Sequence, residues 1–283
     1  MLSFPNCKIN LGLHILRKRT DGFHDLETVF YPVGLRDALE VVSSEQSAVG
    51  GQQLAGGEFN FSQTGLEVDG DQEDNLCYKA YHILKRDFPQ LPAVKMHLHK
   101  SIPMGAGLGG GSADAAFALK LLNDKFRLNI SQDQLLLYAA TLGSDGPFFI
   151  INKPCFATSR GEKLEEIKID LSNYNIMLVN PGIHINTGWA FSQLFLDKPT
   201  RKNIKEILQQ PVEDWKEWLT NDFEEPVFKQ YPLIAAAKKE LYEKGALYAA
   251  MSGSGSTVFG IFKKEQQPVF NFDTAYFLKV VPA

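Results

Sequence analysis

The sequence contains one stretch that is unusually rich in glycine, residues 103–116, where five glycines occupy the seven positions 105–111. Glycine lets a backbone approach a ligand closely because it has no side chain, and the free N–H groups at a helix start attract anions. A segment rich in alanine, with helical spacing, follows directly. We therefore expect this stretch to cradle the phosphates of a nucleotide.

Better-known phosphate loops fit this stretch less well. A Walker A loop requires Gly-Lys-Ser/Thr, whereas Gly111 runs into Ser112 with no lysine. The pattern GxGxxG is present, but the preceding residues 94–99 alternate apolar and polar, and a dinucleotide site follows a doubly buried strand. A flexible linker is the remaining alternative, and a linker would not run straight into a capped amphipathic helix.

The elements that must position this loop alternate between strands and helices. Alternating apolar residues predict strands over 9–16, 26–33, 38–42, 59–68 and 94–98, and helical spacing predicts helices over 74–88 and 112–126. Ser112 can cap the second of these helices. Ser131 and Gln134 form a capping box for the next helix, which Gly143 should end. Since the strand over 94–98 has a polar face, we expect a mixed or antiparallel sheet.

The pattern changes character beyond Lys153. Strands are predicted over 176–179, 246–251 and 258–262, and helices over 215–219 and 233–243. A chain of 283 residues exceeds the usual size of one domain. We predict an α/β fold of the α+β type with two lobes, 1–154 and 155–283, and a mobile surface loop over 43–57, where Ser, Gln and Gly are frequent.

Composition excludes several classes of protein. With 44% hydrophobic and 22% charged residues the chain can bury a sizeable core, and its net charge of −4 does not suit a nucleic-acid binder. No apolar run approaches the roughly 20 residues that cross a bilayer. We expect no signal peptide, because most charges of residues 1–19 follow the apolar residues and do not precede them. Cys7, Cys77 and Cys155 lie far apart, which favours a reducing cytoplasm.

Three segments, residues 4–13, 103–116 and 251–259, resemble the three motifs of the GHMP kinase superfamily. Residues 19–24 and 142–149 are similar to the branch whose acceptor is a cytidine-diphosphate-linked methylerythritol, and the match runs from Pro5 to Phe262. The resemblance implies a two-lobed fold with mixed or antiparallel sheets and an active site in the cleft between the lobes. It also implies ATP, Mg²⁺ and phosphorylation of the 2-hydroxyl of the methylerythritol, in the non-mevalonate isoprenoid pathway.

The resemblance assigns roles to individual residues. Lys8 and Asp145 fall on the family's catalytic pair: an Asp can accept or orient the hydroxyl proton, and a Lys favours the developing alkoxide. Ser112 is placed to contact a phosphate or Mg²⁺. One departure is Gly146, where a larger residue is common, and we expect it to loosen the backbone behind Asp145. The implied nucleotide-binding residues are Pro103, Gly105, Gly107, Leu108, Gly109, Gly110, Gly111 and Ser112.

The resemblance also implies how the acceptor is held. Phe23 and His24 correspond to the aromatic ring and imidazole that bind the cytosine, and Phe191 corresponds to the opposing stacking ring. Stacking recognises any base, and polar contacts at its edge then select one. The other implied substrate-binding residues are Asn10, Thr187, Gly253 and Ser254.

Other interpretations stay open at this point. The nearest is another GHMP kinase, with mevalonate, phosphomevalonate or homoserine as its acceptor, and the more distant is a ligand-binding relative without turnover. Outside its motif, a Lys–Asp pair is ordinarily a solvated pair of surface charges. Asp114, in the first helical turn, can simply complement the helix dipole. We expect a small-molecule substrate and no nucleic acid, membrane or obligate protein partner.

Overall fold

The computed structural model spans the chain and describes residues 1–43, 59–68, 70–195, 201–266 and 268–283. It divides into two compact units, each described here by itself. Unit 1 comprises residues 1–6, 36–102 and 110–151, and unit 2 comprises 7–35, 103–109 and 152–283. The chain leaves unit 1 for the last time at residues 151–152, near the boundary predicted at 154. The assignment of lobes 1–154 and 155–283 remains a prediction, because unit 2 also takes in two earlier segments.

Unit 1 is built on a four-stranded sheet in the order β1-β4-β6-β5. Strand β6 pairs with β4 in antiparallel register and with β5 in parallel register, which confirms the predicted mixed sheet. Along β6 the buried side chains Val94, Met96 and Leu98 alternate with more exposed ones, as the sequence pattern predicts. The strands are β1 (Leu2–Ser3), β4 (Ala38–Ser43), β5 (Asn60–Gly65) and β6 (Val94–Lys100).

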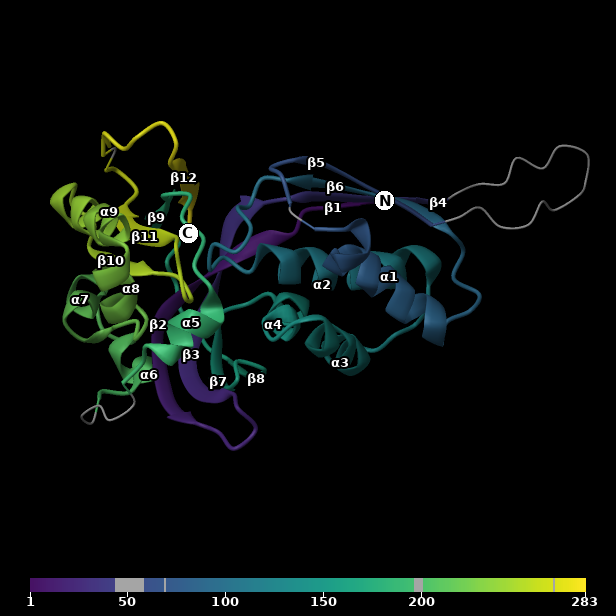
Figure 1. The fold of residues 1–283 in the computed structure, drawn as a ribbon, viewed down its shortest axis with the longest axis horizontal. Coiled ribbons are helices and arrows are strands. Elements are labelled where there is room, and N and C mark those ends of the chain that lie inside the picture. Colours follow the sequence, from purple (N-terminus) through teal and green to yellow (C-terminus); the bar gives the residue numbers. More distant parts are fainter. Residues whose placement is uncertain (44–58, 69, 196–200, 267) are drawn as a thin grey trace, which may run out of the picture. The chain divides into compact units, whose positions relative to one another are not determined.

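Helices cover one face of this sheet (Figure 1). The buried face of α2 is rich in alanine, which lets it pack closely against α1. Asn75 caps α1, and the capping box of Ser131 and Gln134 begins α3, which ends at Gly143 as predicted. The helices are η1 (Gln72–Asp74), α1 (Leu76–Asp87), α2 (Gly110–Phe126), α3 (Gln132–Leu142) and α4 (Gly146–Ile151).

The predicted cap of α2 is wrong. The helix begins at Gly110, directly after Gly109, whose φ of 72° lies in the left-handed region that glycine tolerates. Ser112 therefore lies inside the first turn and does not precede it. Gly110 and Gly111, which were expected to belong to the loop, are thus the first two residues of the helix.

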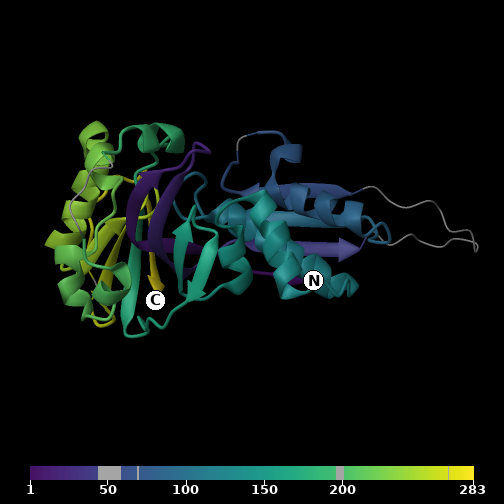
Figure 2. The same ribbon diagram turned by 90° about the horizontal axis from the view of Figure 1, so that it is seen from below.

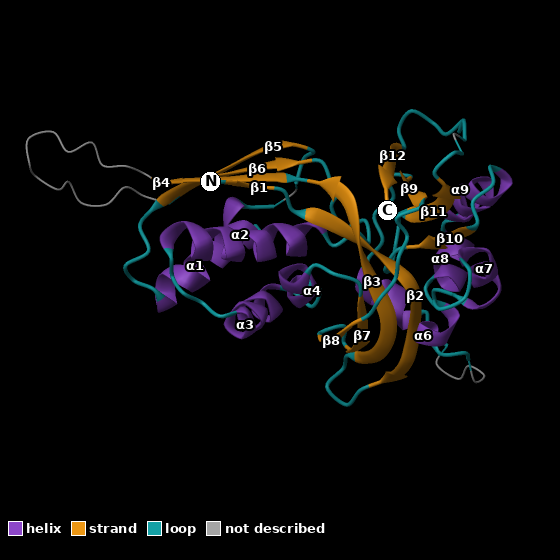
Figure 3. Cartoon of the chain, turned by 180° about the vertical axis from the view of Figure 1, so that it is seen from behind, coloured by secondary structure: helices purple, strands orange, loops and turns teal. Residues whose placement is uncertain are grey.

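Unit 2 contains two four-stranded sheets. One has the order β2-β3-β7-β8, and its first two strands are long and strongly curved (Figure 3). The other has the order β10-β11-β9-β12 and is antiparallel throughout. The strands are β2 (Asn6–Lys18), β3 (His24–Arg36), β7 (Cys155–Ser159), β8 (Lys163–Glu166), β9 (Tyr174–Asn180), β10 (Tyr248–Met251), β11 (Val258–Lys263) and β12 (Phe277–Pro282).

The second sheet of unit 2 is covered by helices on one face (Figure 2). Helix α9 packs on β10 and β11, and its buried residues Ile234, Ala237 and Leu241 share a core with Val258 and Phe262. Apolar burial of this kind is what holds a helix to a sheet. The helices of unit 2 are α5 (Thr187–Ser192), α6 (Ile204–Ile207), η2 (Val212–Asp214), α7 (Trp215–Trp218), α8 (Glu224–Gln230) and α9 (Pro232–Glu243).

Most of the predicted long elements are present, within a few residues at their ends. The short elements α4, α5, β7, β8 and β12 carry too few residues for a clear period and were not predicted. The loop predicted over 43–57 lies, apart from Ser43, outside the described residues. Within the described residues, no helix combines the length and apolar character needed to cross a membrane.

Candidate active site

The glycine-rich loop, residues 103–109, is held in unit 2 by backbone and side-chain contacts. The carbonyl oxygen of Gly107 accepts hydrogen bonds from Lys8 Nζ at 2.9 Å and from Ser252 Oγ at 2.8 Å. The backbone N–H of Lys8 donates to Leu108 O at 3.0 Å, and that of Thr257 donates to Ala106 O at 3.2 Å. The three motifs recognised in the sequence therefore meet at this loop.

Gly107 is a position where only glycine fits. Its φ is 77°, and a Cβ placed on it would lie 2.0 Å from Ser252 O and 2.9 Å from Ser252 C. Gly253, in the same turn as Ser252, is also close, since a Cβ on it would lie 3.3 Å from Gly107 Cα. Two turns thus pack backbone against backbone, and this contact requires glycine at position 107.

Lys8 is 3% exposed, and its ammonium has a fixed direction. Nζ donates to Asn10 Oδ1 at 2.7 Å in addition to Gly107 O, and it lies 5.2 Å from the centroid of the Phe30 ring. Asn10 is itself held, because its Nδ2 donates to Thr28 Oγ1 at 2.9 Å. Lys8 and Asn10 are two residues apart on β2, so their side chains share one face of the strand.

The turn between β10 and β11 is held by two buried asparagines. Asn221 Nδ2 donates to Met251 O at 2.7 Å and to Gly253 O at 2.8 Å. Asn180 Nδ2 donates to Thr257 Oγ1 at 3.0 Å. Amide side chains suit this role because one NH₂ group can satisfy two acceptors.

The predicted acceptor residues Thr187 and Ser254 lie together at the surface of unit 2. Their hydroxyl oxygens are 3.2 Å apart and hydrogen-bonded. Thr187 begins α5 after the cap residue Asn186, and Ser254 lies in the turn that packs on Gly107. The structure therefore brings the start of α5 next to the third motif.

Each of the predicted base-binding rings lies against another side chain. The His24 ring lies on the Phe191 ring, with centroids 4.6 Å apart and planes 18° apart. The Phe23 ring is 52% exposed, and the Arg160 guanidinium lies 4.6 Å from its centroid. One face of Phe191 is thus covered by His24. A base that stacks on that face therefore requires the His24 ring to swing away.

His24 has an altered acid–base behaviour. Burial, and secondly the positive charge of Lys18, lower the pKa of His24 below its usual 6.5. The imidazole is therefore neutral at physiological pH, and it offers one N–H donor and one nitrogen acceptor. A neutral ring of this kind can pair with the mixed donor and acceptor edge of a cytosine.

The lowered pKa of His24 predicts how acceptor binding responds to pH. KM for a cytidine acceptor should stay constant from about pH 8 to pH 6.5 and rise only below 6.5, where protonation removes the ring's acceptor nitrogen. Initial rates measured against acceptor concentration at each pH test this. His24→Ala is the control for titration of the substrate's own phosphates, and an equal rise in that variant would contradict the assignment.

In unit 1, Ser112 lies beside the turn that carries Asp145. A Cβ placed on Gly143 would lie 3.1 Å from Ser112 Oγ, and Gly146 N donates to Gly143 O at 3.0 Å. Asp145 is half-buried and immediately precedes α4. A hydroxyl and a carboxylate predicted to act on phosphate and acceptor are therefore carried by adjoining segments.

Gly146 does not loosen this turn, contrary to our expectation. It is buried, and a Cβ on it would lie 2.4 Å from Ala139 O on α3. Any larger residue would force α3 and α4 apart. The backbone behind Asp145 is therefore held by close packing.

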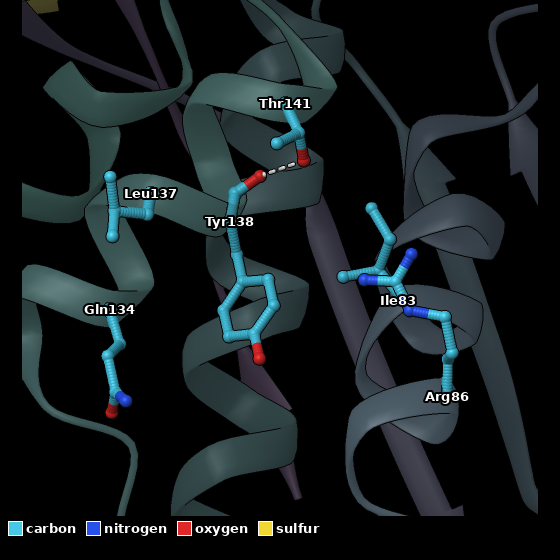
Figure 4. A pocket seen from close by; sticks show the side chains of 6 residues that line it. All are labelled: Ile83, Arg86, Gln134, Leu137, Tyr138 and Thr141. Carbon is cyan, nitrogen blue, oxygen red and sulfur yellow. Dashed lines mark hydrogen bonds between the residues drawn. The ribbon is translucent and has the colours of Figure 1, made fainter.

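A cavity of about 400 Å³ lies between α1 and α3 in unit 1 (Figure 4). The polar groups at its edge bind one another: Tyr138 Oη donates to Asp87 Oδ2 at 2.7 Å, and Arg86 pairs with the same carboxylate. The Thr141 hydroxyl donates to the Tyr138 carbonyl at 2.7 Å. None of the lining residues belongs to the predicted site; they are Ile83, Arg86, Gln134, Leu137, Tyr138 and Thr141.

Comparison with known proteins decides the family. The model of the GHMP kinases N terminal domain matches residues 75–153, and that of the GHMP kinases C terminal domain matches residues 203–270. A 4-diphosphocytidyl-2-C-methyl-D-erythritol kinase of Bacteroides fragilis is 50% identical over 277 residues, which is 98% of this chain and 97% of that protein. The chain belongs to the GHMP kinases, in the 4-diphosphocytidyl-2-C-methyl-D-erythritol kinase family.

Solved structures agree with this GHMP kinase assignment. A crystal structure of 4-(cytidine 5'-diphospho)-2C-methyl-D-erythritol kinase superposes with a TM-score of 0.77 at 28% identity, covering 92% of this chain and 90% of that one. A homoserine kinase from Cytophaga hutchinsonii gives a TM-score of 0.63 at 16% identity, covering 98% and 94%, and shows the fold alone. The predicted GHMP kinase fold is confirmed.

Within this GHMP kinase, several predicted residues lie together. Unit 2 brings Lys8, Asn10, Gly107 and Gly253 to one place, and pairs His24 with Phe191 and Thr187 with Ser254. Unit 1 holds Gly110, Gly111 and Ser112 in the first turn of α2. Pro103, Gly105, Leu108 and Gly109 belong to the loop itself. The functional pairing of Lys8 with Asp145 stays a prediction.

Sequence reasoning missed the side chains that hold the third motif of the GHMP kinase. Ser252 stands beside the recognised glycines, so its position offered a signal. Asn221 and Asn180 offered none, because each lies far along the chain from the turn it supports. Only the fold brings these residues into contact.

Proposed function

We propose that the protein transfers the γ-phosphoryl group of ATP to the 2-hydroxyl of 4-diphosphocytidyl-2-C-methyl-D-erythritol in the non-mevalonate isoprenoid pathway. The observation that carries the proposal is the carbonyl of Gly107, which Lys8 and Ser252 both bind. It ties the phosphate loop to the first and third motifs in one arrangement. The 50% identity to a kinase named for this acceptor supports the same choice.

The chemistry assigns one role to each charged residue. Asp145 orients the 2-hydroxyl and takes its proton as the oxygen bonds to the γ-phosphorus. The bond between that phosphorus and the bridging oxygen breaks, and ADP leaves. Lys8 stabilises the negative charge on the attacking oxygen, and its contacts with Asn10 and Gly107 keep the ammonium from rotating away.

The nucleotide's phosphates are bound by backbone N–H groups of the loop and of the first turn of α2. A helix start attracts anions, and the glycines let the phosphates come close. Mg²⁺ would be held by the nucleotide's phosphates and the Ser112 hydroxyl, and it would neutralise charge on the transferred group. No cluster of three or more acidic, His or Cys ligands occurs in the described part of the chain, which suits an ion that keeps waters and phosphates as ligands.

The acceptor is recognised at its base and at its diphosphate. Phe23 and Phe191 stack on the cytosine, and His24 pairs with its edge. Asn10 contacts the methylerythritol, and Thr187, Gly253 and Ser254 contact the diphosphate. The mutual hydrogen bond of Thr187 and Ser254 supports a shared polar ligand, because both hydroxyls are exposed at one point.

Other GHMP kinase acceptors are distinguished by direct assay. Mevalonate, phosphomevalonate and homoserine lack a base. Phe23 would therefore have no ring to stack on, and His24 would have no base edge to pair with, in these acceptors. ADP release with ATP and Mg²⁺ should be fast with the cytidine acceptor and near background with these three. Comparable turnover with any of them would displace the proposal, and no turnover with any acceptor would favour a ligand-binding relative.

We predict a clear preference for the cytidine acceptor over its uridine counterpart. Cytosine and uracil present opposite donors and acceptors at position 4 and N3, so the wrong base leaves a buried polar group unsatisfied, at about 1–3 kcal/mol per group. The ratio of kcat/KM should therefore be roughly tenfold to a hundredfold. His24→Ala should reduce that ratio. Equal kcat/KM values in the unmodified enzyme would reject cytidine recognition.

The aromatic residues provide the matched control. Phe23→Ala or Phe191→Ala should weaken both acceptors alike, because stacking does not depend on the base's edge. If these variants changed the preference between the cytidine and uridine acceptors, recognition of the base's edge could not be assigned to His24. We place the enzyme in the cytoplasm, where its three buried cysteine thiols stay reduced.

A further inference from the structure

Unit 1 contains a buried cluster of one ammonium and two carboxylates. Lys100, the last residue of β6, is fully buried at its side chain, and its Nζ donates to Asp37 Oδ2 and to Asp114 Oδ2, the latter at 2.7 Å. Asp37 Oδ1 accepts the backbone N–H groups of Ser101 at 2.6 Å and Ile102 at 2.9 Å. None of these side chains has a role in the chemistry described above.

The cluster joins the two ends of the phosphate loop. Ile102 is the residue before the loop and Gly110 is the residue after it. A Cβ on Gly110 would lie 2.9 Å from Ile102 Cγ2 and 3.3 Å from Lys100 Nζ, so the two ends lie against each other and Gly110 lies against the lysine. Asp114, in the same helical region as Gly110, completes the connection through its bond to the ammonium.

Stability alone does not account for this cluster. Apolar residues of similar size commonly stabilise a protein as well as a buried ion pair does, because burying charge is costly. Burial raises the pKa of Asp114 well above its usual range, so its charged form is costly here, and Asp114 Oδ1 has no hydrogen-bond partner within the described structure. What the cluster provides, and apolar residues cannot, is direction, since each hydrogen bond fixes two atoms relative to each other.

We propose that Lys100, Asp37 and Asp114 are positioning residues that fix the ends of the phosphate loop and so set the affinity for ATP. The proposal rests on the proposed function, in which the loop's N–H groups bind the nucleotide's phosphates. Those groups bind well only if they converge, and a loop whose ends are fixed loses less freedom when it binds. The cluster touches no reacting atom.

Replacement of Asp114 tests the proposal. Each variant is titrated with ATP and Mg²⁺ in the absence of acceptor, and calorimetry measures the affinity for ATP. Asp114→Leu removes the acceptor of the lysine's hydrogen bond and should weaken ATP binding about tenfold. Asp114→Asn keeps an oxygen acceptor for Lys100 and should restore affinity to within about threefold of the unmodified protein. Asp124→Leu, on the exposed face of α2, is the matched control and should bind normally.

The comparison separates positioning from charge and from folding. Both Asp114 variants remove the same ionisable group, so equal effects in the two, or tighter binding in both, would overturn the proposal. A purely structural role would lower Tm and kcat in Asp114→Leu, while KM for ATP in the folded fraction stayed unchanged, and that outcome would also overturn it. In steady-state kinetics of Asp114→Leu, the proposal requires that KM for ATP rises and that KM for the acceptor stays unchanged.

If Asp114→Leu does not fold, Asp37→Asn takes its place, because the amide turns a donor toward Lys100, and unchanged ATP affinity in that variant would reject the proposal. If the unmodified protein does not bind ATP, the proposed function fails and the positioning role with it. If the unmodified protein and Asp114→Leu bind ATP equally well, the positioning role is rejected and the proposed function is unaffected.

Discussion

Asp145→Asn should lower kcat by roughly 10²-fold or more while ATP binding stays intact. The amide keeps the size of the side chain but cannot accept the hydroxyl proton. Asp145 precedes α4, whose first residue is packed tightly on α3, so the turn should keep its shape in the variant. Single-turnover transfer from labelled ATP measures the step directly, and calorimetric titration measures nucleotide binding.

Asp133→Asn gives the matched comparison, because it makes the same chemical change on the exposed first turn of α3. It should transfer phosphate at the normal rate. An Asp145→Asn variant with kcat within about threefold of the unmodified enzyme would remove Asp145 from the chemistry, since a positioned acid–base group contributes about 10²-fold or more. Lost ATP binding in that variant would instead point to a role for Asp145 in holding the nucleotide.

The periodic elements of this fold could be predicted from the sequence because their signals are local. Alternation along 94–98 predicted a strand with one polar face, and β6 has that face. Ser131 and Gln134 predicted the start of α3, since a capping box is contained within four residues. The start of α2 was misplaced because a helix can begin on glycines when the preceding residue takes a left-handed φ, and composition does not reveal φ.

The candidate site was predicted only as far as its motifs reach. The loop, Lys8 and the third motif each carry a recognisable pattern, and the structure joins them through Gly107 O. Asn221 and the Lys100 cluster carry no pattern, because their partners lie far away in the sequence. Candidate binding residues can thus be named from family resemblance, whereas the residues that hold them in place are found only from the fold.

Gly107→Val should abolish ATP binding, with a loss of more than about 10²-fold in affinity. A β-branched residue resists a φ of 77°, and its Cβ would overlap the Ser252 carbonyl at 2.0 Å. Since the overlap is with backbone, the loop and the turn at Ser252 must separate. Acceptor binding should weaken too, because that turn carries Gly253 and Ser254. Titration with ATP and with the cytidine acceptor measures both losses.

Gly182→Val separates the overlap from the backbone strain. Gly182 has a φ of 72°, close to that of Gly107, but a Cβ on it would meet nothing within 4 Å. Its substitution should therefore cost only the left-handed conformation, about 1–2 kcal/mol of stability, and leave ATP affinity unchanged. Gly110→Val is intermediate, because its Cβ would press on the buried Ile102 side chain at 2.9 Å and not on backbone. If Gly107→Val binds ATP as well as Gly182→Val does, the loop does not hold the nucleotide, and the glycines only connect β6 to α2.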